Sequence, residues 1–278
     1  MLHIGKINTL RAIDALPFGF YLQGDDPEWV LLPRDAAPAS LAIGDSLDVL
    51  VYHDKEGQLV ATQASPTALR DQCALMTVKH ISDAGAFVEW LDDKDLLVPH
   101  KEQDKPLQQG LAYMVYVTLD AQRERLIGST RLHRFLSEKG QDFSPRQAVT
   151  LTAVARTDLG MKVIINDTHL GLLFKDELIK PLSVGERCDG FIKRIRDDGK
   201  IDVSLQLHDE QARQDLGEAI IDDLRAHGGI STLTDKSAPN DILQRFGVSK
   251  GAYKKALGNL YKQQRIRLEK DRITLIEP

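Results

Sequence analysis

Residues 85–100, GAFVEWLDDKDLLVPH, start with a glycine and hold two apolar runs separated by a charged turn. Glycines at positions 19 and 160 open similar segments, and in all three copies the second apolar run ends 14 residues after the glycine. A further glycine follows 11 residues later, at positions 44, 110 and 185. Because both spacings recur in every copy, the sequence predicts a threefold structural repeat.

Each copy also has the periodicity of β-strands. In the first copy the apolar residues Leu47, Val49 and Val51 alternate with more polar ones such as Asp48. Alternation at period two indicates a strand with one buried face. About 60 residues with five short strands fit a small closed barrel, which leaves no strand edge exposed. We therefore predict OB-type barrels at residues 1–65, 66–130 and 148–208, with a short helical connector at 131–147.

The periodicity becomes helical in the last quarter of the chain. Leu216 and Ile220 share one helix face, and this helix ends at two consecutive glycines. Pro239 suits the first turn of a second helix, and Ser249 suits the N-cap of a third. Two short alternating segments then form a predicted hairpin. This order predicts a winged helix at residues 209–278, so the expected fold class is mainly β with a C-terminal α+β domain.

The charge is unevenly distributed along the chain. The whole sequence has 36 Lys and Arg against 41 Asp and Glu, a net charge of −5, which argues against an unspecific polycation. Residues 245–272, however, hold nine cationic and two acidic residues. A surface that binds a polyanion is therefore expected near the C-terminus. No run of about 18 apolar residues and no signal-peptide pattern occurs, so we expect a cytoplasmic protein without a membrane partner.

The sequence contains none of the common catalytic or metal-binding motifs. It has no phosphate-binding loop, no H-E-x-x-H, no G-x-S-x-G and no cluster of Cys and His with zinc spacing. Paired carboxylates, such as those at 197–198, fall in charged turns and are interpreted as solvated loop tips. We expect no enzymatic activity, no cofactor and no metal.

Several segments resemble a known family. The second copy, from AGAFVEW to LLVPHKE, resembles the RNA-binding OB domain named after ribosomal protein S1. The complete order of three such domains and a winged helix resembles the bacterial conserved virulence factor B family, most specifically in GERCDGFIKRIRDDGKIDVSLQ and DKSAPNDILQRFGVSKGAYKKALGNLYK. The resemblance implies RNA binding and post-transcriptional regulation in a bacterium, with no established catalytic activity.

The resemblance also implies an RNA-binding face on each barrel, with aromatics flanking the first glycine and a histidine after the second apolar run. The match is partial in every copy. The first copy, which is the most acidic, offers Phe18, Tyr21 and Arg34, and the second offers Phe87 and His100. The third lacks the aromatics and has cations instead: Lys162, Lys175, Lys193, Arg194 and Arg196.

Alternative roles remain open for these residues. Phe87 could face the core, His100 could be an ordinary surface histidine, and the first barrel could be a spacer or a protein-binding domain. The two tryptophans, Trp29 and Trp90, are expected to pack rather than to bind.

The winged helix adds cations that could meet phosphates spaced along a strand. The candidates are Lys250, Lys254, Lys255, Lys262, Arg265 and Arg267. We expect the cations of the third barrel and the winged helix to form one continuous positive surface for single-stranded RNA. The alternatives are a reader of duplex DNA, with the third helix in the major groove, and a protein-interaction scaffold.

Overall fold

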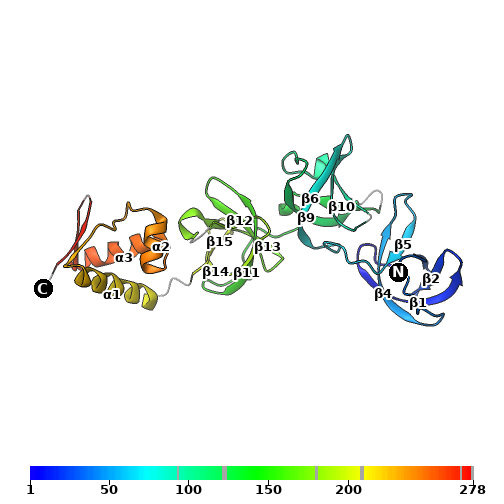
Figure 1. Ribbon diagram of the computed structural model, residues 1–278, viewed down its shortest axis with the longest axis horizontal. Helices are drawn as coiled ribbons and strands as arrows, with labels where there is room; N and C mark the ends of the chain where they lie inside the picture. The colour runs from blue at the N-terminus through cyan, green and yellow to red at the C-terminus, as the bar shows by residue number, and fades with distance from the viewer. Residues whose placement is uncertain (93, 121–123, 179–180, 207–209, 270, 277–278) are drawn as a thin grey trace. The chain divides into compact units, whose positions relative to one another are not determined.

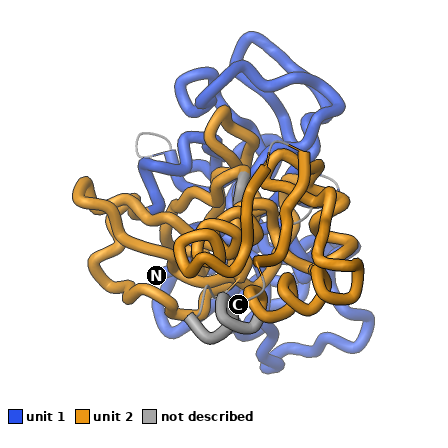
Figure 2. Tube along the Cα trace, turned by 90° about the vertical axis from the view of Figure 1, so that its left-hand side faces the viewer, with its two compact units in different colours: residues 1–136 blue, residues 137–278 orange. Residues whose placement is uncertain are grey.

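The computed structural model describes residues 1–276 apart from 93, 121–123, 179–180, 207–209 and 270, with the backbone alone described at 176 and 210–215. The chain divides into two compact units, residues 1–136 and 137–278, which Figure 2 distinguishes by colour. Unit 1 contains the first two strand repeats, and unit 2 contains the third repeat and the helical domain (Figure 1). No helix within the described residues is long and apolar enough to cross a membrane.

Barrel 1 is a closed barrel with the strand order β1-β2-β3-β5-β4. In β1, every second residue from Asn8 to Ala12 is buried, which is the predicted alternation. A parallel bridge between Leu31 and Val60 joins the third strand to the fifth and closes the barrel. The strands are β1 (Ile7–Leu16), β2 (Gly19–Gln23), β3 (Trp29–Pro33), β4 (Ser46–His53) and β5 (Leu59–Thr62).

Barrel 3 repeats this arrangement with the order β11-β12-β13-β15-β14. Its third and fifth strands also pair in parallel, from Gly171 opposite Ile201 to Leu173 opposite Val203. Its elements are β11 (Ala148–Arg156), β12 (Gly160–Ile165), β13 (His169–Phe174), the 3-10 turn η3 (Lys175–Glu177), β14 (Arg187–Ile195) and β15 (Ile201–Ser204).

Barrel 2 differs from the predicted closed barrel. Its five strands form a sheet in the order β10-β9-β6-β7-β8, and among the described residues no strand pairing joins β8 to β10. The two strands still lie close together, so the sheet is curved like a barrel with a seam. Its elements are β6 (Cys73–Ser82), β7 (Gly85–Val88), β8 (Leu96–Pro99), the 3-10 turn η1 (His100–Glu102), β9 (Ala112–Leu119) and β10 (Leu126–Ser129).

The repeated glycines have two structural roles. In each copy the first glycine pairs with the residue 14 positions later, as Gly85 does with Pro99 in barrel 2. A Cβ at Gly85 would overlap the carbonyl oxygen of Val98 and come within 2.8 Å of Pro99 Cα. The later glycine of each copy has positive φ, and in barrel 2 the Gly110 N–H donates to the Val78 carbonyl at 2.8 Å. The spacings of the repeat therefore record strand register and turn geometry.

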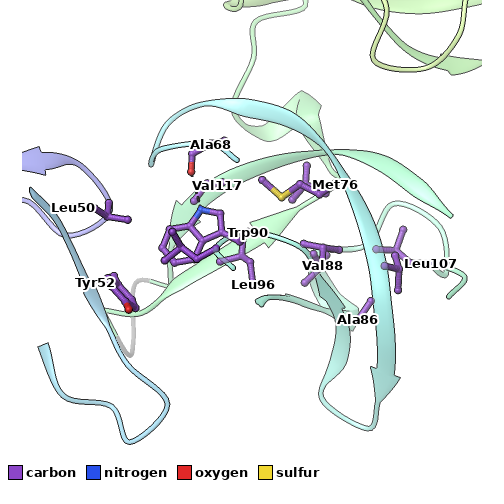
Figure 3. Packing of buried hydrophobic residues seen from close by; sticks show 14 of the residues in the cluster. Leu50, Tyr52, Ala68, Met76, Ala86, Val88, Trp90, Leu96, Leu107 and Val117 are labelled. Atoms are coloured by element: carbon purple, nitrogen blue, oxygen red, sulfur yellow. Dashed lines mark hydrogen bonds between the residues drawn. The ribbon is translucent and has the colours of Figure 1, made fainter. Parts of the chain in front are cut away.

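Barrel 1 has a core of its own, but a few of its buried side chains pack into the core of barrel 2. Leu50 and Tyr52 of β4 lie in the same buried cluster as Trp90, which is only 2% exposed (Figure 3). The Tyr52 and Trp90 rings meet edge to face at 5.8 Å, and the indole N–H donates to the Ala68 carbonyl at 2.7 Å. The packing role expected for Trp90 is confirmed. The connector predicted to be helical contains one short 3-10 turn, η2 (Leu132–Arg134).

The helical domain has the predicted order of a winged helix. Its three short strands form a sheet in the order β16-β18-β17. Pro239 lies in the first turn of the second helix, and the Ser249 hydroxyl caps the third by accepting the Ala252 N–H at 3.2 Å. The elements are α1 (Glu210–Ala226), β16 (Ile230–Ser231), α2 (Pro239–Phe246), α3 (Lys250–Lys262), β17 (Ile266–Leu268) and β18 (Ile273–Leu275).

Tyr253 on α3 anchors the core of the winged helix. Its ring is buried and stacks on Phe246 with 5.2 Å between centroids. Its hydroxyl donates to the Leu233 carbonyl at 2.9 Å. Burial raises the pKa of the Tyr253 phenol to about 12, so it remains a neutral donor over the working pH range. The buried side of α3 is thereby held against the domain, and the other side is left to solvent.

Candidate nucleic-acid interface

Barrel 1 carries an exposed aromatic group on β2 and β3. The Tyr21 and Trp29 rings meet edge to face with centroids 4.4 Å apart, and Trp29 is 56% exposed. Trp29 therefore packs against Tyr21, as expected, but its ring remains largely exposed. Tyr21 pairs with Leu31, and Gln23 pairs with Trp29, so the two rings are diagonal neighbours on one face of the sheet. The sequence would have predicted this pair of rings only if the register between β2 and β3 had been known.

Phe18 and Arg34 lie beside each other where the β1–β2 turn meets the end of β3. Phe18 is 56% exposed, and its carbonyl accepts the backbone N–H of Arg34 at 3.0 Å. The Arg34 guanidinium is exposed and lies 5.2 Å from the centroid of the buried Phe20 ring. Exposed carboxylates lie at positions 25, 26 and 28 in the turn between β2 and β3. Barrel 1 therefore offers stacking surfaces in an acidic setting.

Barrel 2 presents Phe87 on its outer face. Phe87 is half-buried, while its neighbours Ala86 and Val88 are buried, so its ring does not belong to the core. It stacks on His80 of β6 with 4.4 Å between centroids and 12° between planes. His80 was missed by sequence reasoning because it follows a bulge in β6 that shifts the pairing register. His100 is exposed at the first position of η1.

Three cations of barrel 3 are bound by buried carboxylates. Lys193 lies 2.6 Å from a carboxylate oxygen of Glu177, whose side chain is 4% exposed. Arg194 and Arg196 each donate through Nε to Asp202 at 2.7 Å, and the Asp202 side chain is 1% exposed. A buried carboxylate needs such partners because desolvation of an unpaired charge is costly.

Three of the cations expected to form one continuous positive surface are therefore engaged with carboxylates of the barrel itself. The hydrogen bond to Asp202 raises the pKa of Arg196, and Lys193 and Arg194 have equally specific structural partners. Lys162 on β12 is half-buried and Lys175 at the start of η3 is exposed. Neither has an ion pair within the described part of the chain. Of the five cations predicted for barrel 3, these two remain available to a ligand.

In the winged helix, one face of α3 is cationic and exposed. Lys254, Lys255 and Lys262 are exposed, while Ala256 and Leu260 on the other face are buried. Their spacing places them on the same side of the helix. Tyr261, which sequence reasoning missed, is 56% exposed between them. Tyr261 follows Lys254 by seven residues, about two helical turns, and this spacing could have placed it on the same face. We call Lys254, Lys255, Gly258, Tyr261 and Lys262 the α3 face.

Lys250 and the hairpin formed by β17 and β18 supply fewer available cations than the sequence predicted. Lys250 is half-buried at the start of α3, and Arg267 is exposed on β17. Arg265 instead donates both guanidinium nitrogens to Glu218 of α1, one of them at 3.0 Å, so its charge is engaged in this structure. This bond raises the pKa of Arg265 and lowers that of Glu218. Both groups are therefore charged near neutral pH.

Comparison with known proteins agrees with this architecture. The model of the S1 domain matches residues 4–64, and that of the CvfB-like winged helix domain matches residues 218–275. The chain is 28% identical over 272 residues to the protein YitL of Bacillus subtilis, with 94% of this chain and 90% of the relative covered. It is 25% identical over 281 residues to conserved virulence factor B of Staphylococcus epidermidis, with 98% and 94% covered.

A solved structure from Streptococcus pneumoniae, described as a multidomain protein with nucleic acid binding domains, matches 98% of each chain at 24% identity and a TM-score of 0.42. The two domain matches at opposite ends of the chain and the similarity to YitL and conserved virulence factor B confirm the family prediction. Along nearly its whole length the chain is similar to the conserved virulence factor B proteins, and it matches the S1 domain near its N-terminal end and the CvfB-like winged helix domain near its C-terminal end.

Proposed function

We propose that the protein binds single-stranded RNA as a cytoplasmic post-transcriptional regulator in a bacterium and has no enzymatic activity of its own. The S1 and winged helix domains support nucleic-acid binding in general. The α3 face is the observation that carries the proposal, because it combines three exposed lysines with an exposed tyrosine. Among the described residues none of these lysines has an ion pair, so their charges are available to phosphates.

Exposed aromatic rings favour a single strand over a duplex. Bases of a single strand are unstacked and can pack on aromatic side chains, whereas bases of a duplex are already stacked. Rings that are at least half-exposed occur on barrel 1 at Phe18 and Trp29, and on the α3 face at Tyr261. Phe87 and its partner His80 offer a further ring pair on barrel 2.

Barrel 3 contributes through fewer residues than the sequence predicted. Lys162 and Lys175 remain as its phosphate contacts in this proposal. Lys193, Arg194 and Arg196 are assigned to the stability of the barrel, because each already serves a buried carboxylate.

The test is the affinity of the full chain for a labelled 20-nucleotide single-stranded RNA, measured by fluorescence anisotropy over a range of salt concentrations. The double variant Lys254→Glu/Lys255→Glu is expected to weaken binding and to reduce the salt slope by about 0.7 for each phosphate that it no longer neutralises. The matched control Lys105→Glu/Lys236→Glu reverses two exposed lysines outside the proposed surface and is expected to retain most of the affinity.

Competition with duplex DNA tests the nucleic-acid class. Unlabelled single-stranded RNA is expected to displace the probe at lower concentrations than duplex DNA of the same length. Stronger displacement by duplex DNA would favour the alternative in which α3 reads the major groove. Salt-independent binding, or equal affinities of the test and control double variants, would contradict a phosphate-binding α3 face.

A further inference from the structure

Barrel 3 and the winged helix lie against each other within unit 2. The 3-10 turn η3 of barrel 3 lies side by side with α3. Arg156 at the end of β11 and Lys175, the first residue of η3, line a cavity of about 350 Å³ together with Pro239 and Asn240, the first two residues of α2. The N-terminal end of α2 therefore faces barrel 3 across this cavity.

The burial of residues along α3 places its contact with η3 at the first turn of the helix. Residues 250–252 are half-buried, although none of them belongs to the hydrophobic core of the winged helix. Gly258 is the one other half-buried residue of α3, and the space at its Cβ position is open. Tyr261 and Lys262, at the far end of the helix, are exposed. We call residues 239–240 and 250–252 the helix-turn-helix tip.

A helix-turn-helix reads duplex DNA with this tip. The N-terminal residues of its second helix contact base edges in the major groove, while its first helix crosses the phosphate backbone. The major groove of B-DNA is about 12 Å wide, and a helix with its side chains is about 10–12 Å across. A helix that enters the groove therefore fills it, and no room remains for a second domain against its N-terminal end.

The connection between the two domains is short. Five residues separate the end of β15 at Ser204 from the start of α1 at Glu210. A tether of this length spans at most about 20 Å, so it keeps the effective concentration of each domain near the other high. Even a weak contact between barrel 3 and the helix-turn-helix tip is favoured by such a tether.

We propose that barrel 3 covers the helix-turn-helix tip and so prevents α3 from entering the major groove of duplex DNA. Lys254 and Lys255 of the α3 face stay exposed next to the covered turn, so a flexible single strand can still reach them. The inference rests on the proposed function for the ligand of the α3 face. It adds that barrel 3 determines the specificity of the winged helix for a single strand over a duplex.

A crosslinking experiment with the full chain tests whether the tip is covered. Cys73→Ser/Cys188→Ser removes the two native thiols, and Arg156→Cys/Asn240→Cys adds one exposed thiol on each side of the cavity. The control Arg156→Cys/Gln263→Cys moves the second thiol to the exposed C-cap of α3, about 20 Å along the helix axis from its first turn. A short bis-maleimide is expected to crosslink the test pair at least about tenfold faster than the control pair.

Duplex DNA supplies the second measurement. In the crosslinked test protein the tip cannot separate from barrel 3. Its affinity for a duplex of about 20 base pairs is expected to stay within about twofold of that of the protein before crosslinking, because any duplex binding then comes from phosphate contacts elsewhere on the chain. An excess of the same duplex is also expected to leave the rate of crosslinking unchanged.

Equal crosslinking rates of the two pairs would show that barrel 3 does not cover the tip. Loss of duplex binding after crosslinking, or slower crosslinking in the presence of duplex, would show that a duplex reads the tip once barrel 3 has moved away. Each of these results would overturn the inference. Both measurements are made without RNA, so they are independent of the proposed function, which fails if the unaltered chain does not bind single-stranded RNA.

Discussion

At the scale of single residues, the structure separates cations that stabilise the fold from cations that can meet a ligand. The amino-acid composition of a segment counts both kinds of cation and does not distinguish them. Lys254 and Arg265 belong to the same basic segment, yet Lys254 is exposed and Arg265 forms a two-nitrogen contact with Glu218. An exposed ion pair of this kind adds little stability, but it occupies the arginine and cancels its charge locally.

Removal of the Glu218 carboxylate is therefore predicted to strengthen RNA binding. In Glu218→Gln the Arg265 guanidinium has no charged partner at this position, and the affinity for single-stranded RNA should rise by about two- to fivefold. The control Asp222→Asn makes the same charge change on the same helix, where Asp222 pairs with Arg225. Anisotropy titrations should show a smaller gain for the control. Equal gains would indicate a general charge effect and not the release of Arg265.

His53 predicts a pH dependence of the stability of unit 1. Burial, and then the charges of Arg125 and Lys94, lower the pKa of the His53 imidazole. Between this lowered pKa and the usual value of about 6.5, the unfolded chain binds more protons than the folded one. The contribution of His53 is thus complete above about 6.5, and the free energy of unfolding should fall as the pH drops below it.

Urea unfolding of the full chain at several pH values checks this sign. His53→Gln should remove part of the loss of stability on acidification, because glutamine does not titrate. The control is His133→Gln, which replaces an exposed histidine of η2 in the same unit. An identical pH profile for His53→Gln and the unaltered protein would refute the prediction.

At the scale of elements, the strands and helices follow closely from local patterns. Alternation identified the strands, Pro239 and Ser249 marked the helix starts, and the two glycine spacings proved to be strand pairing and turn geometry. The short connector was the exception, since a few residues of helical pattern form only one 3-10 turn. So short a segment forms too few hydrogen bonds to sustain a helix on its own.

Two glycine substitutions should have opposite effects on stability. Gly85 has a φ of +145° and its Cβ position is filled by the backbone of β8, so Gly85→Ala is predicted to destabilise barrel 2 by about 1–3 kcal/mol or more. Gly258 lies within α3 with nothing within 4 Å of its Cβ position, so Gly258→Ala should stabilise the winged helix by about 0.4–1 kcal/mol. Urea unfolding monitored by far-UV circular dichroism measures both, and a neutral Gly85→Ala would contradict the assigned register.

At the scale of the whole molecule, two of the three repeats are joined into one unit. Strand β4 of barrel 1 places Leu50 and Tyr52 in the core around Trp90 (Figure 3). This packing also positions the turn between β4 and β5 (residues 54–58) against barrel 2, where a Cβ at Gly57 would meet the Arg125 guanidinium. Barrels joined by such packing are expected to unfold together.

Trp90→Ala tests this coupling. Loss of the buried indole is predicted to lower the free energy of unfolding of unit 1 by about 3–5 kcal/mol. Hydrogen exchange should speed up for amides of both barrels. The control Trp29→Ala removes an exposed ring and should cost about 1 kcal/mol or less. Unchanged exchange in barrel 1 of the Trp90→Ala protein would show that the two barrels are not a cooperative unit.

The amino-acid sequence by itself determined the repeat, the class of each domain, the order of the winged helix and the lysines of α3, because these follow from spacing and periodicity along the chain. Only the tertiary structure decided which cations pair with buried carboxylates, that Trp29 is exposed and Trp90 buried, and that a turn of barrel 1 lies against barrel 2. The physical reason is that ion pairing, side-chain burial and the missing pairing of β8 with β10 all depend on contacts between residues far apart in the sequence. No local pattern predicts such contacts.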